Sequence, residues 1–80
     1  MTKSVFTDAY RHLMHTLIQV RKDAKITQHE LATRLSKPQS FVAKYESGER
    51  RLDVVELLQI TDALGMDVFP LIRDLQTKIE

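Results

Sequence analysis

Residues 28–48, QHELATRLSKPQSFVAKYESG, decide the fold of this chain, because two short amphipathic segments meet there at a polar turn. Apolar residues recur at helical spacing in both segments. They are Leu31, Ala32 and Leu35 in the first segment and Val42 and Tyr45 in the second. Each segment therefore has one side to bury and one side left free, and the pattern predicts two helices joined by a short turn.

The free side of the second segment carries Gln39, Ser40 and Lys44. Amide, hydroxyl and ammonium groups hydrogen-bond base edges and phosphates, and an α-helix has the right width for the major groove of DNA. The arrangement predicts a helix-turn-helix that contacts double-stranded DNA.

The stretch TQHELATRLSKPQSFVAKYESGER resembles the DNA-binding domain of phage Cro and cI-type repressors, also called the XRE type. The matching positions are Thr27, Gln28, Leu31, Ala32, Leu35, Gln39, Ser40, Val42, Tyr45, Glu46 and Gly48. With the downstream GERRLDVVELLQITDALG, the resemblance covers about residues 10–75. It implies one all-α, lambda-repressor-like domain of five helices over residues 1–80. The expected helices are 8–24, 28–35, 38–47 (the recognition helix), 53–64 and 67–79.

Local signals support these helices. Thr7 or Asp8 is expected to cap the first helix, and Thr27 with Glu30 and Asp53 with Glu56 have capping-box spacing. Pro38 suits the first turn of the third helix, and Gly48 and Gly65 suit helix ends. The expected core residues of the first and fourth helices are Tyr10, Leu13, Met14, Leu17, Ile18, Val54, Leu57, Leu58, Ile60 and Leu64.

The expected base-contacting residues are Gln39, Ser40, Ala43 and Lys44. The resembling repressors use a Gln at the position of Gln39 to reach into the groove, and its amide can donate to and accept from adenine; the alternative is a solvated polar residue near a helix start. Ser40 reaches either a base or a phosphate. Lys44 suits guanine or a phosphate, and Ala43 touches a thymine methyl or nothing. The expected phosphate-contacting residues are Thr27, Gln28, Lys37, Ser47, Arg50 and Arg51. An alternative for Arg50 and Arg51 is a solvated pair beside Glu49 and Asp53.

The resemblance also implies a structural ion pair between Arg21 and Glu46. Phe41 is interpreted as the edge of the core, the alternative being a wedge between base pairs. Two positions depart from the family pattern, because Ser36 and Lys25 stand where glycine is common. If left-handed, each costs about 1 kcal/mol.

Charge is divided unevenly along the chain. Residues 1–52 hold ten Lys or Arg against five Asp or Glu, whereas residues 53–80 hold two against six. The basic part suits a polyanion. The chain has no cysteine, no apolar signal core and no apolar run long enough for a membrane span, so we expect a cytoplasmic protein.

A single 80-residue domain offers few DNA contacts, so we expect a homodimer on a pseudo-palindromic operator, acting as a repressor. The expected dimer interface is Val68, Phe69, Leu71, Ile72, Leu75 and Ile79, part of which must also serve the core. The alternative is an antitoxin-like module that binds a partner protein, with DNA binding serving its own regulation.

Asp8, His12 and His15 have the spacing of a metal site on one helix face. They are more simply interpreted as surface residues, because three ligands on an exposed helix lack supporting partners. His29 is isolated, and no catalytic triad spacing, phosphate loop or paired carboxylates are found. We therefore expect no enzymatic activity, cofactor or metal.

Overall fold

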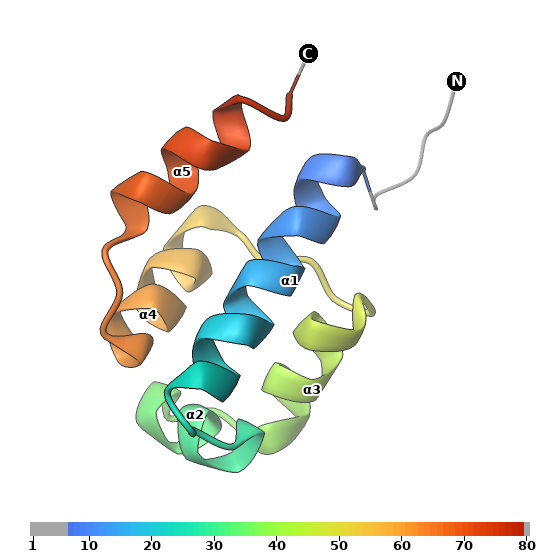
Figure 1. Ribbon diagram of the computed structural model, residues 1–80. Helices are drawn as coiled ribbons and strands as arrows, with labels where there is room; N and C mark the ends of the chain where they lie inside the picture. Colours follow the sequence, from blue (N-terminus) through green and yellow to red (C-terminus); the bar gives the residue numbers. More distant parts are fainter. Residues whose placement is uncertain (1–6, 80) are drawn as a thin grey trace.

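The computed structural model describes residues 7–79, and this part of the chain folds into five α-helices with no strand (Figure 1). All-α architecture, expected from the sequence, is confirmed. The helices are α1 (Asp8–Asp23), α2 (Gln28–Leu35), α3 (Gln39–Ser47), α4 (Val54–Leu64) and α5 (Val68–Gln76).

Side-chain caps fix the starts of four helices, including α5, where the Asp67 carboxylate accepts a hydrogen bond from the Phe69 amide. The Thr7 hydroxyl accepts a hydrogen bond from the Tyr10 amide at the start of α1. Reciprocal capping boxes form between Thr27 and Glu30 at α2 and between Asp53 and Glu56 at α4. Each box satisfies two backbone N–H groups that would otherwise have no partner in the helix.

Left-handed residues close α2, α3 and α4, namely Ser36, Gly48 and Gly65. Lys25, in the loop after α1, is also left-handed. The φ angles of Ser36 and Lys25 are 57° and 61°, so the two departures from glycine do fall where a side chain costs about 1 kcal/mol.

All five helices contribute to one core. Leu17, Leu31, Val42, Tyr45 and Ile60 are fully buried. They come from α1, α2, α3 and α4, and Leu71 of α5 covers the same cluster. The core therefore fixes α3 through Val42 and Tyr45, which leaves the opposite side of α3 free.

Several sequence-based expectations need correction. Val54 and Leu58, expected in the core, are 68% and 44% exposed, because the buried face of α4 is the stripe that contains Leu57 and Ile60. Ile18 is only half-buried. Pro38 is the N-cap of α3 and not its first helical residue, with an extended ψ of 155°. The α5 helix ends at Gln76, before the expected residue 79.

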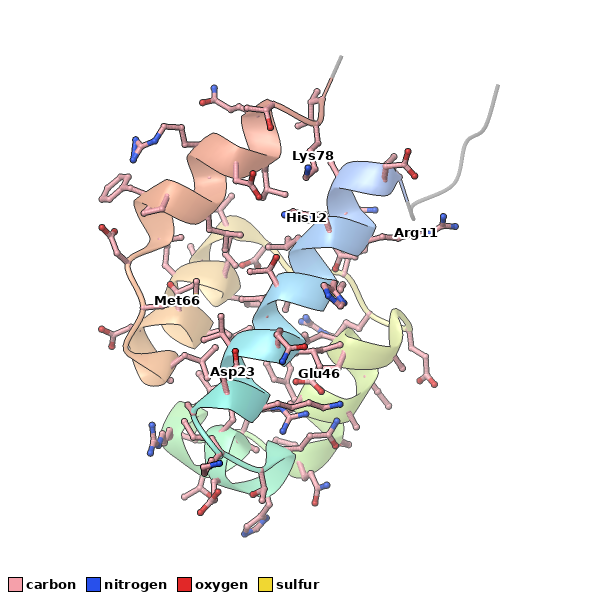
Figure 2. All side chains as sticks on the ribbon, in the orientation of Figure 1. Arg11, His12, Asp23, Glu46, Met66 and Lys78 are labelled. Atoms are coloured by element: carbon pink, nitrogen blue, oxygen red, sulfur yellow. The ribbon has the colours of Figure 1, made fainter. Side chains whose placement is uncertain are left out.

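Figure 1 shows α5 and α3 on different sides of α1, with α2 and α3 together at one end of the molecule. α5 packs on α1 and α4, whereas α3 packs on α2 and α1. His12 of α1 contacts Asp74 of α5 and ties these two helices together (Figure 2). Across residues 7–79, no helix combines the length and apolar character needed to cross a bilayer.

Candidate nucleic-acid interface

The exposed side of α3 carries the residues expected to contact DNA. Since each helical residue turns by about 100°, the side chains from Gln39 to Lys44 span about 140° of the helix circumference on this side. The side chains on this arc are Gln39, Ser40, Ala43, Lys44 and Ser47, of which all but the half-buried Ala43 are exposed. Val42 and Tyr45 point the other way into the core. We call this surface the α3 arc.

The start of α3 carries no side-chain cap, because its N-cap residue is Pro38. The Phe41 amide bonds to the Pro38 carbonyl, at 3.0 Å. Gln39 and Ser40 therefore stand exposed at the positive end of the helix dipole. This is the end that a helix-turn-helix inserts into the major groove.

A buried polar network borders one edge of the α3 arc. The Nε and Nη2 atoms of Arg21 donate to the two Glu46 carboxylate oxygens, at 2.7 and 3.0 Å. Arg21 also donates to the Ile26 carbonyl, and Gln28 donates its amide N–H to Glu46 at 2.9 Å. Figure 2 shows Glu46 between α1 and α3. The hydrogen bond to Glu46 raises the pKa of Arg21, so the guanidinium stays charged.

An aromatic and charged group borders the opposite edge. The Phe41 ring meets Tyr45 edge-on, with centroids 5.6 Å apart. The Lys37 ammonium lies 5.2 Å and the Arg50 guanidinium carbon 4.9 Å from the centroid of Phe41. These distances are typical of cation–π contacts. Phe41 is half-buried, which agrees with its interpretation as the edge of the core.

Arg50 is held by Glu56 in a two-bond ion pair. Its Nη2 and Nη1 atoms donate to the carboxylate at 2.6 and 2.9 Å, and Nη1 also donates to the Arg51 carbonyl. These bonds, with that of the Asp53 amide, lower the pKa of Glu56 to about 2. The sequence suggests a phosphate contact or a solvated pair for Arg50, whereas in the structure Arg50 binds Glu56. The six-residue spacing across a bend gave no signal for this pair.

Arg51 and Leu52 attach the same connector to α1. The Arg51 guanidinium lies 4.2 Å from the centroid of the Tyr10 ring, and the Leu52 amide donates to the Tyr10 hydroxyl at 3.2 Å. The connector between α3 and α4 is therefore anchored on two aromatic side chains, Phe41 and Tyr10.

The other residues expected at phosphates lie near the helix ends. Thr27 caps α2, Lys37 lies in the turn before α3, and Ser47 donates to the Lys44 carbonyl at the end of α3. Gln28 uses one N–H for Glu46, and an amide nitrogen carries a second hydrogen. The second hydrogen leaves Gln28 able to donate to a phosphate as well.

The expected dimer stripe on α5 divides into two parts. Leu71 is buried, and Val68 and Leu75 are half-buried, because all three pack against the protomer's own core. Phe69, Ile72 and Ile79 remain 69%, 39% and 65% exposed. α4 adds exposed apolar residues that sequence analysis did not place at an interface: Val54, Val55 and Leu58.

Among the described residues no cluster of His, Cys, Asp or Glu has the composition of a metal site. The spacing of His12 with Asp8 and His15 suggests a shared helix face. In the structure the His12 ring is hydrogen-bonded to the Asp74 carboxylate on α5.

Comparison with known proteins agrees with this geometry. Residues 17–71 match the helix-turn-helix family. The structure is similar to that of an XRE-family like protein from Pseudomonas syringae pv. tomato str. DC3000, with a TM-score of 0.85 and 42% sequence identity. The match covers 91% of this chain and 89% of the other. A search of curated proteins finds no significant match.

The matched residues make up more than half of the chain, and the identity extends over nearly all of it. The fold and the exposed second helix of the motif thus define a DNA-binding domain of the helix-turn-helix class. The chain belongs to the XRE family within this class, whose members are transcriptional regulators.

Proposed function

We propose that this protein is a sequence-specific repressor that binds a pseudo-palindromic operator as a homodimer in the cytoplasm. The observation that carries the proposal is the α3 arc, which is polar and exposed at the uncapped start of the recognition helix. Base edges in the major groove offer donors and acceptors that match amide, hydroxyl and ammonium groups.

Gln39 is assigned the main base-reading role, since it is exposed at the first position of α3 and its amide matches adenine. Ser40, Ala43 and Lys44 follow along the same arc. Thr27, Gln28, Lys37, Ser47 and Arg51 are assigned to the phosphate frame. Arg50 is assigned a structural role, because Glu56 already neutralises its charge.

The dimer is assigned to the exposed apolar residues of α5 and α4. Phe69 and Ile72 lie three residues apart on α5, and Val54 and Leu58 lie four apart on α4, so each pair forms a stripe along its helix. Two copies would bury these stripes together, whereas an isolated monomer exposes them to water. α5 and α3 pack on different partners around α1, which leaves the α3 arc available for DNA.

The test is selection of bound sequences from a random pool of duplexes, with wild-type protein and Gln39→Ala. We expect an inverted repeat whose half-sites are about one helical turn apart. Gln39→Ala should relax the preference at one symmetric position by about 1–3 kcal/mol. Lys78→Gln, at the other end of the molecule (Figure 2), is the control that should keep the motif.

Two outcomes would contradict the proposal in different ways. A motif without inverted symmetry, together with monomeric sedimentation on and off DNA, would exclude the dimer. Binding without any sequence preference, together with a second protein that co-purifies from the native host and protects the α4 and α5 residues, would favour the partner-binding alternative.

A further inference from the structure

We propose that Phe41 is a positioning residue for the phosphate contacts of the recognition helix. This inference rests on the proposed DNA binding. In this role the Phe41 ring holds the Lys37 ammonium at the edge of the α3 arc, where the ammonium can bind a backbone phosphate.

The position of Phe41 on the helix supports this role. Phe41 lies about 60° beyond Lys44 around the helix axis, at the border between the α3 arc and the core. Its ring packs against the ring of the fully buried Tyr45, and two cations lie over the same Phe41 ring. The ring is therefore fixed from inside and presented at the border of the DNA-facing surface.

Two cations approach this one ring from opposite ends of α3. Lys37 precedes the helix and Arg50 follows it, yet their charged groups lie 5.2 and 4.9 Å from the same centroid. Two positive charges at one ring repel each other, and the Glu56 carboxylate offsets this by binding Arg50. Lys37 in turn lies near enough to Glu56 to lower its pKa slightly.

The two cations differ in what else they bind. Arg50 directs three N–H bonds to Glu56 and the Arg51 carbonyl, so it serves to hold the connector. Lys37 is exposed, and it stands directly before Pro38 at the start of α3. A lysine side chain normally loses much rotamer freedom when it binds a phosphate. Restricting Lys37 over the ring before DNA arrives reduces that loss.

The experiment is a double-mutant cycle of Phe41→Leu and Lys37→Gln, read out as affinity for a labelled duplex of random sequence. A random duplex reports phosphate contacts without knowledge of the operator. Affinities are measured between about 50 and about 200 mM salt, and thermal unfolding shows that each variant is folded at the assay temperature. Phe41→Tyr, which keeps the ring, is the conservative variant, and Lys78→Gln is the charge control.

We expect Phe41→Leu to weaken binding about two- to fivefold in the wild-type background. The same change should have little effect once Lys37 is Gln. A plot of log affinity against log salt has a negative slope. Lys37→Gln should reduce the magnitude of this slope by about 0.9, and Phe41→Leu should reduce it by part of that amount. Phe41→Tyr should restore wild-type affinity and slope.

Equal weakening by Phe41→Leu in both backgrounds, or an unchanged salt slope, would overturn the inference and leave Phe41 with a packing role only. If instead wild-type protein fails to bind any duplex, the proposed function fails and this inference fails with it. If wild type binds and only the cycle shows no coupling, the proposed function stands and this inference alone is wrong.

Discussion

The α3 arc is bordered by two ion pairs of the same chemistry in different surroundings. On one edge Arg21 binds Glu46, and their side chains are 9% and 6% exposed. On the other edge Arg50 binds Glu56, with 43% and 14% of the side chains exposed. Both pairs use two N–H bonds to one carboxylate, so the difference between them is their contact with water.

Screening by water decides how much each ion pair contributes to the free energy of unfolding. An ion pair near the surface gains little net free energy, because both charges were already well solvated. In a buried pair the loss of one partner leaves the other charge without water or counter-charge, which is costly. The comparison therefore predicts that the buried pair controls the stability of the fold, and that the exposed pair acts on the local geometry of the connector.

The largest effect is expected for Glu46→Ala. This change strands the Arg21 guanidinium and removes the acceptor of Gln28. We expect the free energy of unfolding to fall by about 3 kcal/mol or more. The measurement is urea or thermal unfolding followed by circular dichroism. An unchanged midpoint would show that the pair is not structural.

Two controls sharpen this prediction. Glu49→Ala removes an exposed carboxylate just beyond the same end of α3, and it should change the midpoint little. The double change of Arg21→Met with Glu46→Leu removes both charges together. It should recover much of the stability lost in Glu46→Ala, since no buried charge remains unpaired.

The next effect in size is expected for Arg50→Gln, which breaks the exposed pair. Since water replaces the lost partner of Glu56, the loss of stability should be at most about a third of that in Glu46→Ala. The effect should also shrink as salt rises. Unfolding measured at low and high salt tests this, and a salt-independent loss as large as that of Glu46→Ala would contradict the comparison.

The two edges of the α3 arc also differ in how many of their contacts could be predicted from the sequence. The Arg21–Glu46 pair was expected from the resemblance, because both residues match positions of a known motif. The caps at Thr27 and Asp53 followed from local spacing, which depends only on helix geometry. The five helices and the exposed position of Gln39 were predictable for the same reason.

The aromatic edge was not predictable in this way. Arg50 reaches the Phe41 ring only because the left-handed Gly48 ends α3 and turns the connector back toward the helix. The exposure of Val54 and Leu58 was missed for a related reason. The apolar residues of α4 are spread around most of its circumference, so their periodicity alone does not tell which stripe faces the core.

The smallest effect concerns the pH dependence of the exposed pair, tested with Glu56→Gln. A Gln side chain can still accept the hydrogen bond from the Asp53 amide, so the change removes the charge more than the helix cap. The pKa of Glu56 falls from its ordinary 4.5 to about 2 in the folded protein, first because of the Arg50 hydrogen bonds. A carboxylate with a lowered pKa stabilises the fold above its unfolded pKa, and this contribution is lost as pH falls through the folded pKa.

The stability difference between wild type and Glu56→Gln should therefore be constant above about pH 4.5 and should shrink steadily toward pH 2. Other carboxylates titrate in the same range, including Glu30, whose pKa is lowered by its capping bonds to Thr27. The difference between the two proteins cancels these shared contributions and isolates Glu56. A difference that stays constant down to pH 2 would mean that the ionised carboxylate of Glu56 stabilises the fold no more than its protonated form does, and the exposed pair would then contribute no charge interaction to the connector.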